Sequence, residues 1–205
     1  MLFATLPEAR HELVSLRPIV EADLRVWYAY LSTPAVYEYT SWNPSSTSEL
    51  SQYVWTPEEF TDSSLLRLAI ALRATGELVG TAGFHTVSRQ NRSAELAFDL
   101  SPSVWGKGIA TYVCQLLVAW AHDSVGLLRV RGQATVLESN ARSAAVLERC
   151  GFVREGLLGS YRLVRGRPGN FYCIHMSSLC TQSPSEAEQQ FIADTFALLT
   201  CACYP

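Results

Sequence analysis

The sequence predicts a single α+β domain with a mixed, mostly antiparallel central sheet flanked by helices, and an extra helix at the C-terminus. Two patterns predict this fold class. Short segments alternate apolar and polar residues, as half-buried strands do, and longer segments repeat apolar residues at helical spacing. The chain has 205 residues, of which 48% are hydrophobic, and this is enough to bury one sizeable core. We expect the domain to cover residues 1–176 and an extension to cover residues 177–205.

Helices and strands follow one another along the domain. Helical spacing predicts helices at residues 21–31 and 108–124, and Ser46 with Glu49 is typical of the capping box that opens a further one. Gly76 fits the tight turn of a hairpin, and residues 162–169 are expected to form a polar hairpin. Strands are predicted at residues 13–16, 66–73, 78–86, 93–100, 128–134, 152–155 and 170–176.

The C-terminal extension carries its own helix signals. Ser183 is a good cap, Pro184 suits the first turn and Glu186 places an acid near the helix N-terminus, so we expect a helix at about 184–199. Its apolar residues need a partner surface, either the domain itself or a second copy of the chain in a homodimer. These residues are Phe191, Ile192, Phe196, Leu198 and Leu199.

Charge and cysteine usage narrow the classes of partner. The net charge of -3 argues against a general nucleic-acid or membrane-surface binder, because such proteins carry a basic excess. The N-terminal residues lack a signal-peptide pattern, and no apolar run approaches the roughly 18 residues of a membrane span. We therefore expect a cytoplasmic protein. Cys114, Cys150 and Cys173 lie in helix and strand patterns and are interpreted as free thiols, and Cys201 with Cys203 has no accompanying cluster, so no metal is predicted.

A glycine-containing loop at the start of a long helix is the strongest functional signal. Residues 105–111 place Gly106 and Gly108 where unpaired N–H groups and the positive end of the helix dipole favour a phosphate. The loop matches neither standard nucleotide motif, since no Ser or Thr follows its Gly-Lys pair and its glycines lack the dinucleotide spacing. Another carrier of pyrophosphate, coenzyme A, is therefore the expected ligand.

A second motif follows at residues 140–152, where a helix begins at Asn140 and ends at Gly151 before a strand. Together with the glycine loop, it resembles the GNAT superfamily of acetyl-CoA-dependent N-acetyltransferases, and within it the branch that acetylates the N-termini of ribosomal proteins. The resemblance covers about residues 13–176. It implies transfer of an acetyl group from acetyl-CoA to a primary amine, on a protein N-terminus or a small molecule, by direct attack in a ternary complex. The cofactor-binding residues that it implies are Phe98, Leu100, Trp105, Gly106, Lys107, Gly108, Ile109, Ala110, Thr111, Asn140 and Ser143.

Such a reaction needs a base for the amine and an acid for the departing thiolate. Alternation along residues 93–100 puts Glu95 and Asp99 on one face. By resemblance Glu95 is the base, although a strand carboxylate is also commonly solvated or paired with an arginine. Asp99 lies near the strand end and ranks below it, and His85 is an alternative base because of its intrinsic pKa.

The sequence departs from the family pattern at two positions. Many members carry a tyrosine acid seven residues beyond the Asn, where this chain has Leu147; in the resembling branch a serine takes this role, and Ser143 stands at its position. Ser143 could equally make only a hydrogen bond within its helix, and Asn140 could be only a helix cap. An Arg or Gln often opens the glycine loop, where this chain has Trp105.

The sequence leaves the acceptor and two rival functions open. Aromatic residues after the first helix are either core or a wall for a peptide N-terminus or a small cation. The rival functions are a non-catalytic acyl-CoA sensor, in which no base is productive, and a structural protein whose Gly-Lys-Gly is only a turn. The aromatic residues are Tyr37, Tyr39, Trp42, Tyr53 and Trp55.

Overall fold

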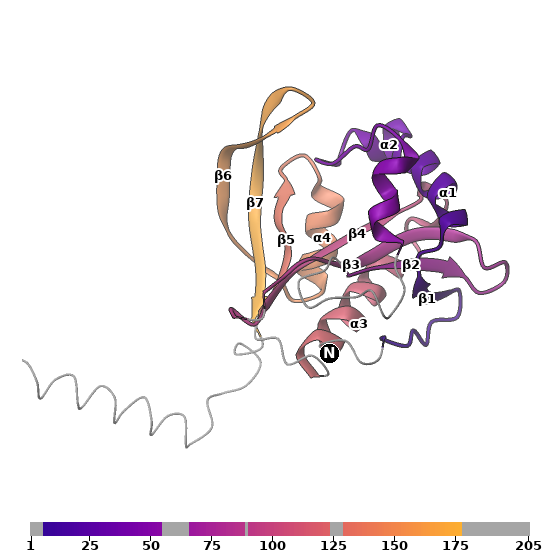
Figure 1. The fold of residues 1–205 in the computed structure, drawn as a ribbon. Coiled ribbons are helices and arrows are strands. Elements are labelled where there is room, and N and C mark those ends of the chain that lie inside the picture. The colour runs from indigo at the N-terminus through magenta and orange to yellow at the C-terminus, as the bar shows by residue number, and fades with distance from the viewer. Residues whose placement is uncertain (1–5, 55–65, 89, 124–128, 178–205) are drawn as a thin grey trace, which may run out of the picture.

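A seven-stranded sheet organises the computed structural model, which describes residues 6–54, 66–88, 90–123 and 129–177. The strand order is β1-β2-β3-β4-β5-β7-β6, and neighbouring strands are antiparallel except β4 and β5, which run parallel (Figure 1). The predicted mixed, mostly antiparallel sheet is therefore confirmed. The strands are β1 Val14–Pro18, β2 Leu66–Leu72, β3 Leu78–Ser88, β4 Ser93–Leu100, β5 Arg129–Leu137, β6 Val153–Val164 and β7 Arg167–Ser177.

Helices cover both faces of this sheet. The main core joins α3 and α4 to one face, with Leu117 and Leu147 packed among strand residues such as Phe84. A second cluster joins α1 and η1 to the other face around Trp27, which is fully buried. The helices are α1 Glu21–Leu31, α2 Pro34–Tyr37, η1 Thr47–Tyr53, η2 Pro102–Val104, α3 Ile109–Asp123 and α4 Ala141–Arg149.

Two local predictions are wrong. The predicted capping box does not form: residues 47–53 are a 3₁₀ helix, the Ser46 side chain makes no cap bond, and Glu49 accepts hydrogen bonds from the Ser45 amide and hydroxyl. The expected hairpin at 162–169 does form, since Arg162 pairs with Gly169, but the strands predicted at 152–155 and 170–176 are too short, because β6 and β7 continue through the hairpin. Backbone hydrogen bonds extend these strands beyond the core, where no apolar alternation is required.

Several other predictions can be compared directly with the described residues. The bounds of α1 and β4 agree with the prediction, Gly76 adopts the expected left-handed backbone with φ of 74°, and Cys114, Cys150 and Cys173 are thiols outside any disulfide. The helix expected at 184–199, Trp55, Cys201 and Cys203 lie outside the described residues. Within the described ranges, no helix has the length and apolar character needed to cross a membrane.

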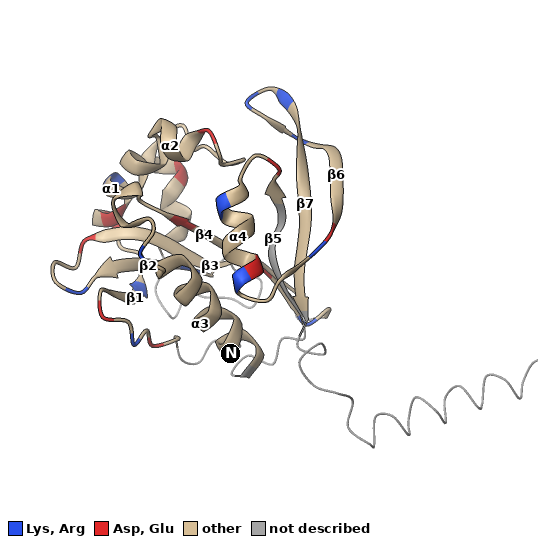
Figure 2. Cartoon of the chain, turned by 180° about the vertical axis from the view of Figure 1, so that it is seen from behind, with Lys and Arg blue, Asp and Glu red and all other residues tan. Residues whose placement is uncertain are grey.

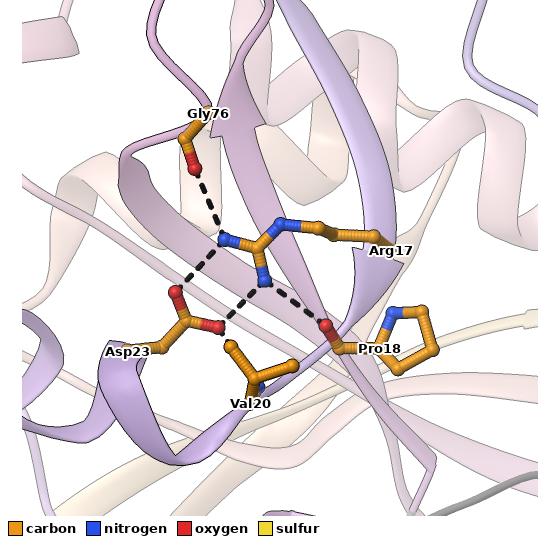
Figure 3. A network of polar contacts seen from close by, with 5 residues as sticks. All are labelled: Arg17, Pro18, Val20, Asp23 and Gly76. Carbon is orange, nitrogen blue, oxygen red and sulfur yellow. Dashed lines mark hydrogen bonds and ion pairs between the residues drawn. The ribbon is translucent and has the colours of Figure 1, made fainter.

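A bidentate ion pair fixes the first helix to the sheet (Figure 3). Arg17 on β1 donates to both carboxylate oxygens of Asp23 on α1, at 2.6 and 2.8 Å, and also to the carbonyls of Pro18 and Gly76. The Asp23 carboxylate accepts a further hydrogen bond of 2.9 Å from the Val20 amide at the start of α1. One carboxylate therefore links β1, α1 and, through Arg17, the β2–β3 turn.

The stability of the fold should depend on the charge of Asp23. Burial raises the pKa of this carboxyl, but the hydrogen bonds from Arg17 and Val20 outweigh burial and leave the pKa below its ordinary value. A lowered folded pKa means that the stabilisation is complete above the unfolded pKa of about 3.9 and is lost as pH falls through the folded pKa. We expect Asp23→Asn to lower the melting temperature near neutral pH and the gap from wild type to shrink below about pH 4. Calorimetry across this pH range measures the two melting temperatures. A difference between them that does not change with pH would contradict the prediction.

Candidate active site

The site lies where two parallel strands separate. β4 and β5 pair only from Ser93 to Leu96 on β4, whereas β4 stays paired with β3 as far as Leu100. A cavity of about 870 Å³ lies beside this end of β4, and its lining includes residues of β4, α3, α4 and the loop after α2. β4 is therefore separated from β5 at residues 98–100, and both Phe98 and Leu100 line the cavity.

The glycine loop forms the wall of the cavity at the start of α3. Gly106 and Gly108 each have a φ of 74°, which L side chains rarely adopt, and the space where their side chains would lie is open. Their conformation and the unpaired amides of the first helical turn form a cradle that fits a phosphate group. Lys107 is exposed and lies outside the cavity lining. The residues of this segment that line the cavity are Trp105, Gly106, Gly108, Ile109, Ala110 and Thr111.

Positive charge reaches this loop from α4. The Arg142 guanidinium lies 4.7 Å above the Trp105 ring, and Arg149 donates to the Thr111 hydroxyl at 3.4 Å. The Trp105 indole N–H donates to the Leu100 carbonyl at 2.9 Å, which fixes the ring against the end of β4. The polar side chain that the family pattern places at position 105 is thus absent, but cationic groups stand at both ends of the loop. Figure 2 shows this charge at both ends of α4.

Asn140 and Ser143 lie together at the start of α4 and line the cavity. Asn140 is the N-cap, since its side-chain oxygen accepts a hydrogen bond of 3.1 Å from the Ser143 amide. Its side-chain nitrogen donates to the Tyr39 carbonyl at 2.9 Å, which connects α4 to the loop after α2. Leu147 is buried in the core, so the tyrosine position of the family pattern supplies no acid to the cavity.

The tip of the β6–β7 hairpin holds the same loop from the other side. Arg165 donates to the carbonyls of Tyr37 at 2.8 Å, Glu38 at 3.0 Å and Thr40 at 2.9 Å, and stacks on the Tyr37 ring. Basic residues at this tip appear in Figure 2. The loop that carries Tyr39 and Trp42 into the cavity lining is therefore positioned by both α4 and the hairpin.

The two β4 carboxylates differ in their surroundings. Asp99 is paired with Arg67, and the side chains are 8% and 7% exposed, respectively. Its oxygens also accept hydrogen bonds from Thr81 at 2.8 Å, Trp27 at 3.1 Å and the Tyr30 hydroxyl. Four donors already occupy the oxygens of this carboxylate, so Asp99 is a structural group rather than a base. This agrees with its lower rank as a base in the sequence-based prediction.

Glu95 lies four residues before Asp99 on the same strand and the same face. Unlike Asp99, it has no hydrogen-bond donor among the described side chains. It is half-buried, lines the cavity, and makes no hydrogen bond or ion pair with another described side chain. His85 lines the same cavity. Burial lowers the His85 pKa, and the charges of Arg67 and Arg162 add to this, while Glu95 acts in the opposite direction. Among the described residues of the lining, Glu95 and His85 are thus the two candidates for the proton acceptor.

The aromatic residues divide between wall and core. Tyr39, Trp42 and Tyr53 line the cavity, and Trp42 and Tyr53 pack edge-to-face with Trp27. Tyr37 instead packs beneath Arg165. The sequence-based search missed four arginines of the lining, namely Arg67, Arg142, Arg149 and Arg162. Only the first had a signal, because a lone arginine within the apolar strand sequence Leu-Arg-Leu-Ala-Ile-Ala-Leu indicates a buried ion pair.

Comparison with known proteins identifies the family. Residues 14–153 match the family described as an acetyltransferase (GNAT) domain, so the chain belongs to this family and is an acetyl-CoA-dependent acyltransferase. A Bacillus licheniformis protein named uncharacterized N-acetyltransferase p20 is 32% identical over 169 residues, which cover 80% of this chain and 93% of that protein.

Solved structures share the fold. The spermidine N-acetyltransferase from Vibrio cholerae, crystallised with CoA and spermine, matches with a TM-score of 0.68 and 21% identity over 80% of this chain and 95% of that one. The ribosomal-protein-S5-alanine acetyltransferase from Vibrio fischeri matches with a TM-score of 0.70 and 16% identity, over 83% and 96% of the two chains.

The glycine loop makes a direct prediction for cofactor affinity. Gly108→Val places a β-branched side chain at a left-handed position where a phosphate must approach the amides, so acetyl-CoA should bind at least tenfold more weakly, or about 1.4 kcal/mol. Gly76→Val is the matched control, because Gly76 has the same φ of 74° and similar open space but lies in the β2–β3 turn. Calorimetric titration of both folded variants decides, and unchanged affinity in Gly108→Val would remove the loop from the cofactor site.

Proposed function

We propose that the chain transfers the acetyl group of acetyl-CoA to a primary amine, on a peptide N-terminus or a small molecule, by direct attack in a ternary complex. One observation carries the proposal: the glycine loop at the start of α3 and the half-buried, unpaired Glu95 line the same cavity. The solved structures named above support an amine acceptor, since one is a spermidine N-acetyltransferase and another is a ribosomal-protein-S5-alanine acetyltransferase.

Each chemical requirement has a candidate group in this cavity. When bound, acetyl-CoA supplies the acetyl group as a thioester. Glu95 accepts the proton of the ammonium group, directly or through a water, so that the amine nitrogen can bond to the acetyl carbon. The Ser143 hydroxyl donates a proton to sulfur as the carbon–sulfur bond breaks, and it regains a proton from the nitrogen, directly or through a water, as the amide forms. Backbone N–H groups of residues 98–100, beyond the point where β5 leaves β4, are placed to stabilise the developing oxyanion.

His85 is the second candidate for the base. It shares the cavity with Glu95, and its lowered pKa leaves it neutral near pH 7 and able to accept a proton. Its Nδ1 lies 3.3 Å from the Thr86 hydroxyl. We prefer Glu95 because it projects from the strand whose far end separates from β5, whereas His85 projects from the next strand.

An acceptor screen tests the proposed function. The protein is mixed with acetyl-CoA and a panel of small amines, polyamines and peptides with free N-termini, and thiol release is followed together with the mass of the acceptor. We expect release that depends on the amine and produces an acetylated amine in equal amount. Thiol release that is the same with and without every amine would reject the proposal and leave hydrolysis.

A further inference from the structure

Arg67 is a buried arginine that lines the cavity, and one of its guanidinium nitrogens bonds to no described residue. Arg67 lies on β2, its side chain is 7% exposed, and it lines the cavity. Its Nε donates to the Thr81 hydroxyl at 2.8 Å and its Nη2 pairs with Asp99, whereas Nη1 makes no hydrogen bond with any described residue. Because Arg67 lines the cavity, a ligand or a water there can accept a hydrogen bond from Nη1.

The register of the sheet places Arg67 and Glu95 on the same face, which borders the cavity. Arg67 pairs with Gly83, and Gly83 pairs with Ala97, so the three residues form one row across β2, β3 and β4. Glu95 is two residues from Ala97 along β4 and therefore shares its face. A Cβ at Gly83 would collide with the Leu66 backbone, and Ala97 carries only a methyl group, so no large side chain separates Arg67 from Glu95 in this row.

Electrostatic effects agree with this arrangement. His85, Glu95, Arg67 and Tyr53 all line the cavity. The charges of Glu95 and Arg67 shift the His85 pKa in opposite directions, and the Tyr53 pKa is raised by burial and lowered in part by Arg67. The Arg67 guanidinium also lies 5.9 Å from the centre of the Trp27 ring. The contacts with Trp27, Thr81 and Asp99 hold the guanidinium in one orientation.

We propose that Arg67 determines acceptor specificity: its free Nη1 donates a hydrogen bond to an oxygen of the acceptor, next to the amine that Glu95 deprotonates. The inference rests on the proposed function and narrows its substrate class. The acceptor is an amine with a neighbouring carbonyl, such as an amino-acid amide or a peptide N-terminus. Because Asp99 neutralises Arg67, a neutral carbonyl oxygen suits the site without an unbalanced charge.

The charges of the lining disfavour a polyamine. The described residues that line the cavity include two carboxylates, Glu95 and Asp99, and Asp99 is already paired. Arg67, Arg142, Arg149 and Arg162 line the same cavity. A second ammonium group of a polyamine would therefore meet guanidinium groups and no free carboxylate. Like charges in a partly desolvated site oppose binding.

The test compares acceptors that differ only in this oxygen. Phenylalaninamide and 2-phenylethylamine share their aromatic group and chain, and the carboxamide is present in the first alone. Rates are expressed per unprotonated amine, because the two amines have different pKa values. We expect kcat/KM for the amide to exceed that of the plain amine by at least tenfold, since a site built to bond an oxygen rejects an analogue without it. The best acceptor of the screen is compared with its own analogue that lacks the oxygen.

Arg67→Lys connects the preference to this side chain. Lysine keeps a positive charge for Asp99 but has no second nitrogen to extend to the acceptor, so the ratio of the two kcat/KM values should fall towards one. Arg25→Lys, at an exposed position of α1, is the matched control and should keep the wild-type ratio. If circular dichroism shows that Arg67→Lys does not fold, the comparison of the two amines in the wild-type protein decides whether the site selects for the acceptor oxygen.

Three results separate the possible failures. Equal kcat/KM for both amines in wild type, or a wild-type ratio in folded Arg67→Lys, would overturn the role of Arg67 and leave the proposed function intact. A polyamine as the best acceptor would likewise overturn the role of Arg67 and leave the proposed function intact. Absence of any acetylated amine, in a protein that binds acetyl-CoA, would overturn the proposed function and this inference with it.

Discussion

Replacing Glu95 with glutamine should lower turnover by about a hundredfold or more while leaving acetyl-CoA affinity nearly unchanged. Glutamine keeps the shape of the side chain but cannot accept the ammonium proton. The half-buried position of Glu95 in the cavity lining makes this loss specific to the site. Steady-state rates with one identified acceptor, and calorimetric titration with acetyl-CoA, measure the two quantities. Glu12→Gln, at an exposed position outside the cavity lining, is the control and should behave as wild type.

The pH profile distinguishes the base from the acid. Raising the pH should restore part of the loss in Glu95→Gln, because free amine becomes more abundant. Ser143→Ala should instead change the alkaline limb, where a proton donor for the departing thiolate matters most. Rates from about pH 6 to 10 cover both limbs. A Glu95→Gln variant with wild-type rates and profile would remove Glu95 from the mechanism and leave His85 or a water chain as the base.

Replacing Asp99 with alanine should destabilise the fold by about 3–5 kcal/mol, because Arg67 would remain as a buried cation without its partner. The hydrogen bonds from Thr81, Trp27 and Tyr30 would lose their acceptor at the same time. Urea unfolding monitored by circular dichroism measures the change in the free energy of unfolding. Because the three donors come from β3 and α1, the loss should also loosen the packing of α1 on the sheet.

The matched control is an exposed arginine–carboxylate pair between α4 and β6. Arg154 and Glu148 are 39% and 44% exposed, so Glu148→Ala should cost about 1 kcal/mol or less. Comparable losses in both variants would show that burial does not set the energy of the Asp99 pair. In that case the assignment of Asp99 to structure rather than to proton transfer would lose its support.

Residue periodicity and the positions of two glycines were enough to predict the fold class and the outline of the site. Alternation in residues 93–100 placed Glu95 and Asp99 on one face, and the strand is observed with these bounds. Gly106 and Gly108 predicted a tight loop before a helix, and both adopt the left-handed backbone that glycine permits. These are local properties, because backbone conformation and residue periodicity over a few positions decide them.

The tertiary structure decided which polar groups are partners. Asp99 and Glu95 are chemically similar in the sequence, and only the approach of Arg67 from β2 and Tyr30 from α1 commits one of them to structure. The charge absent at Trp105 is supplied by Arg142, which is 37 positions away in sequence but adjacent in space. Likewise β6 and β7 extend through a polar segment whose periodicity gave no strand signal. Burial and pairing depend on contacts between distant segments, and the pattern of a single sequence does not specify which segments meet.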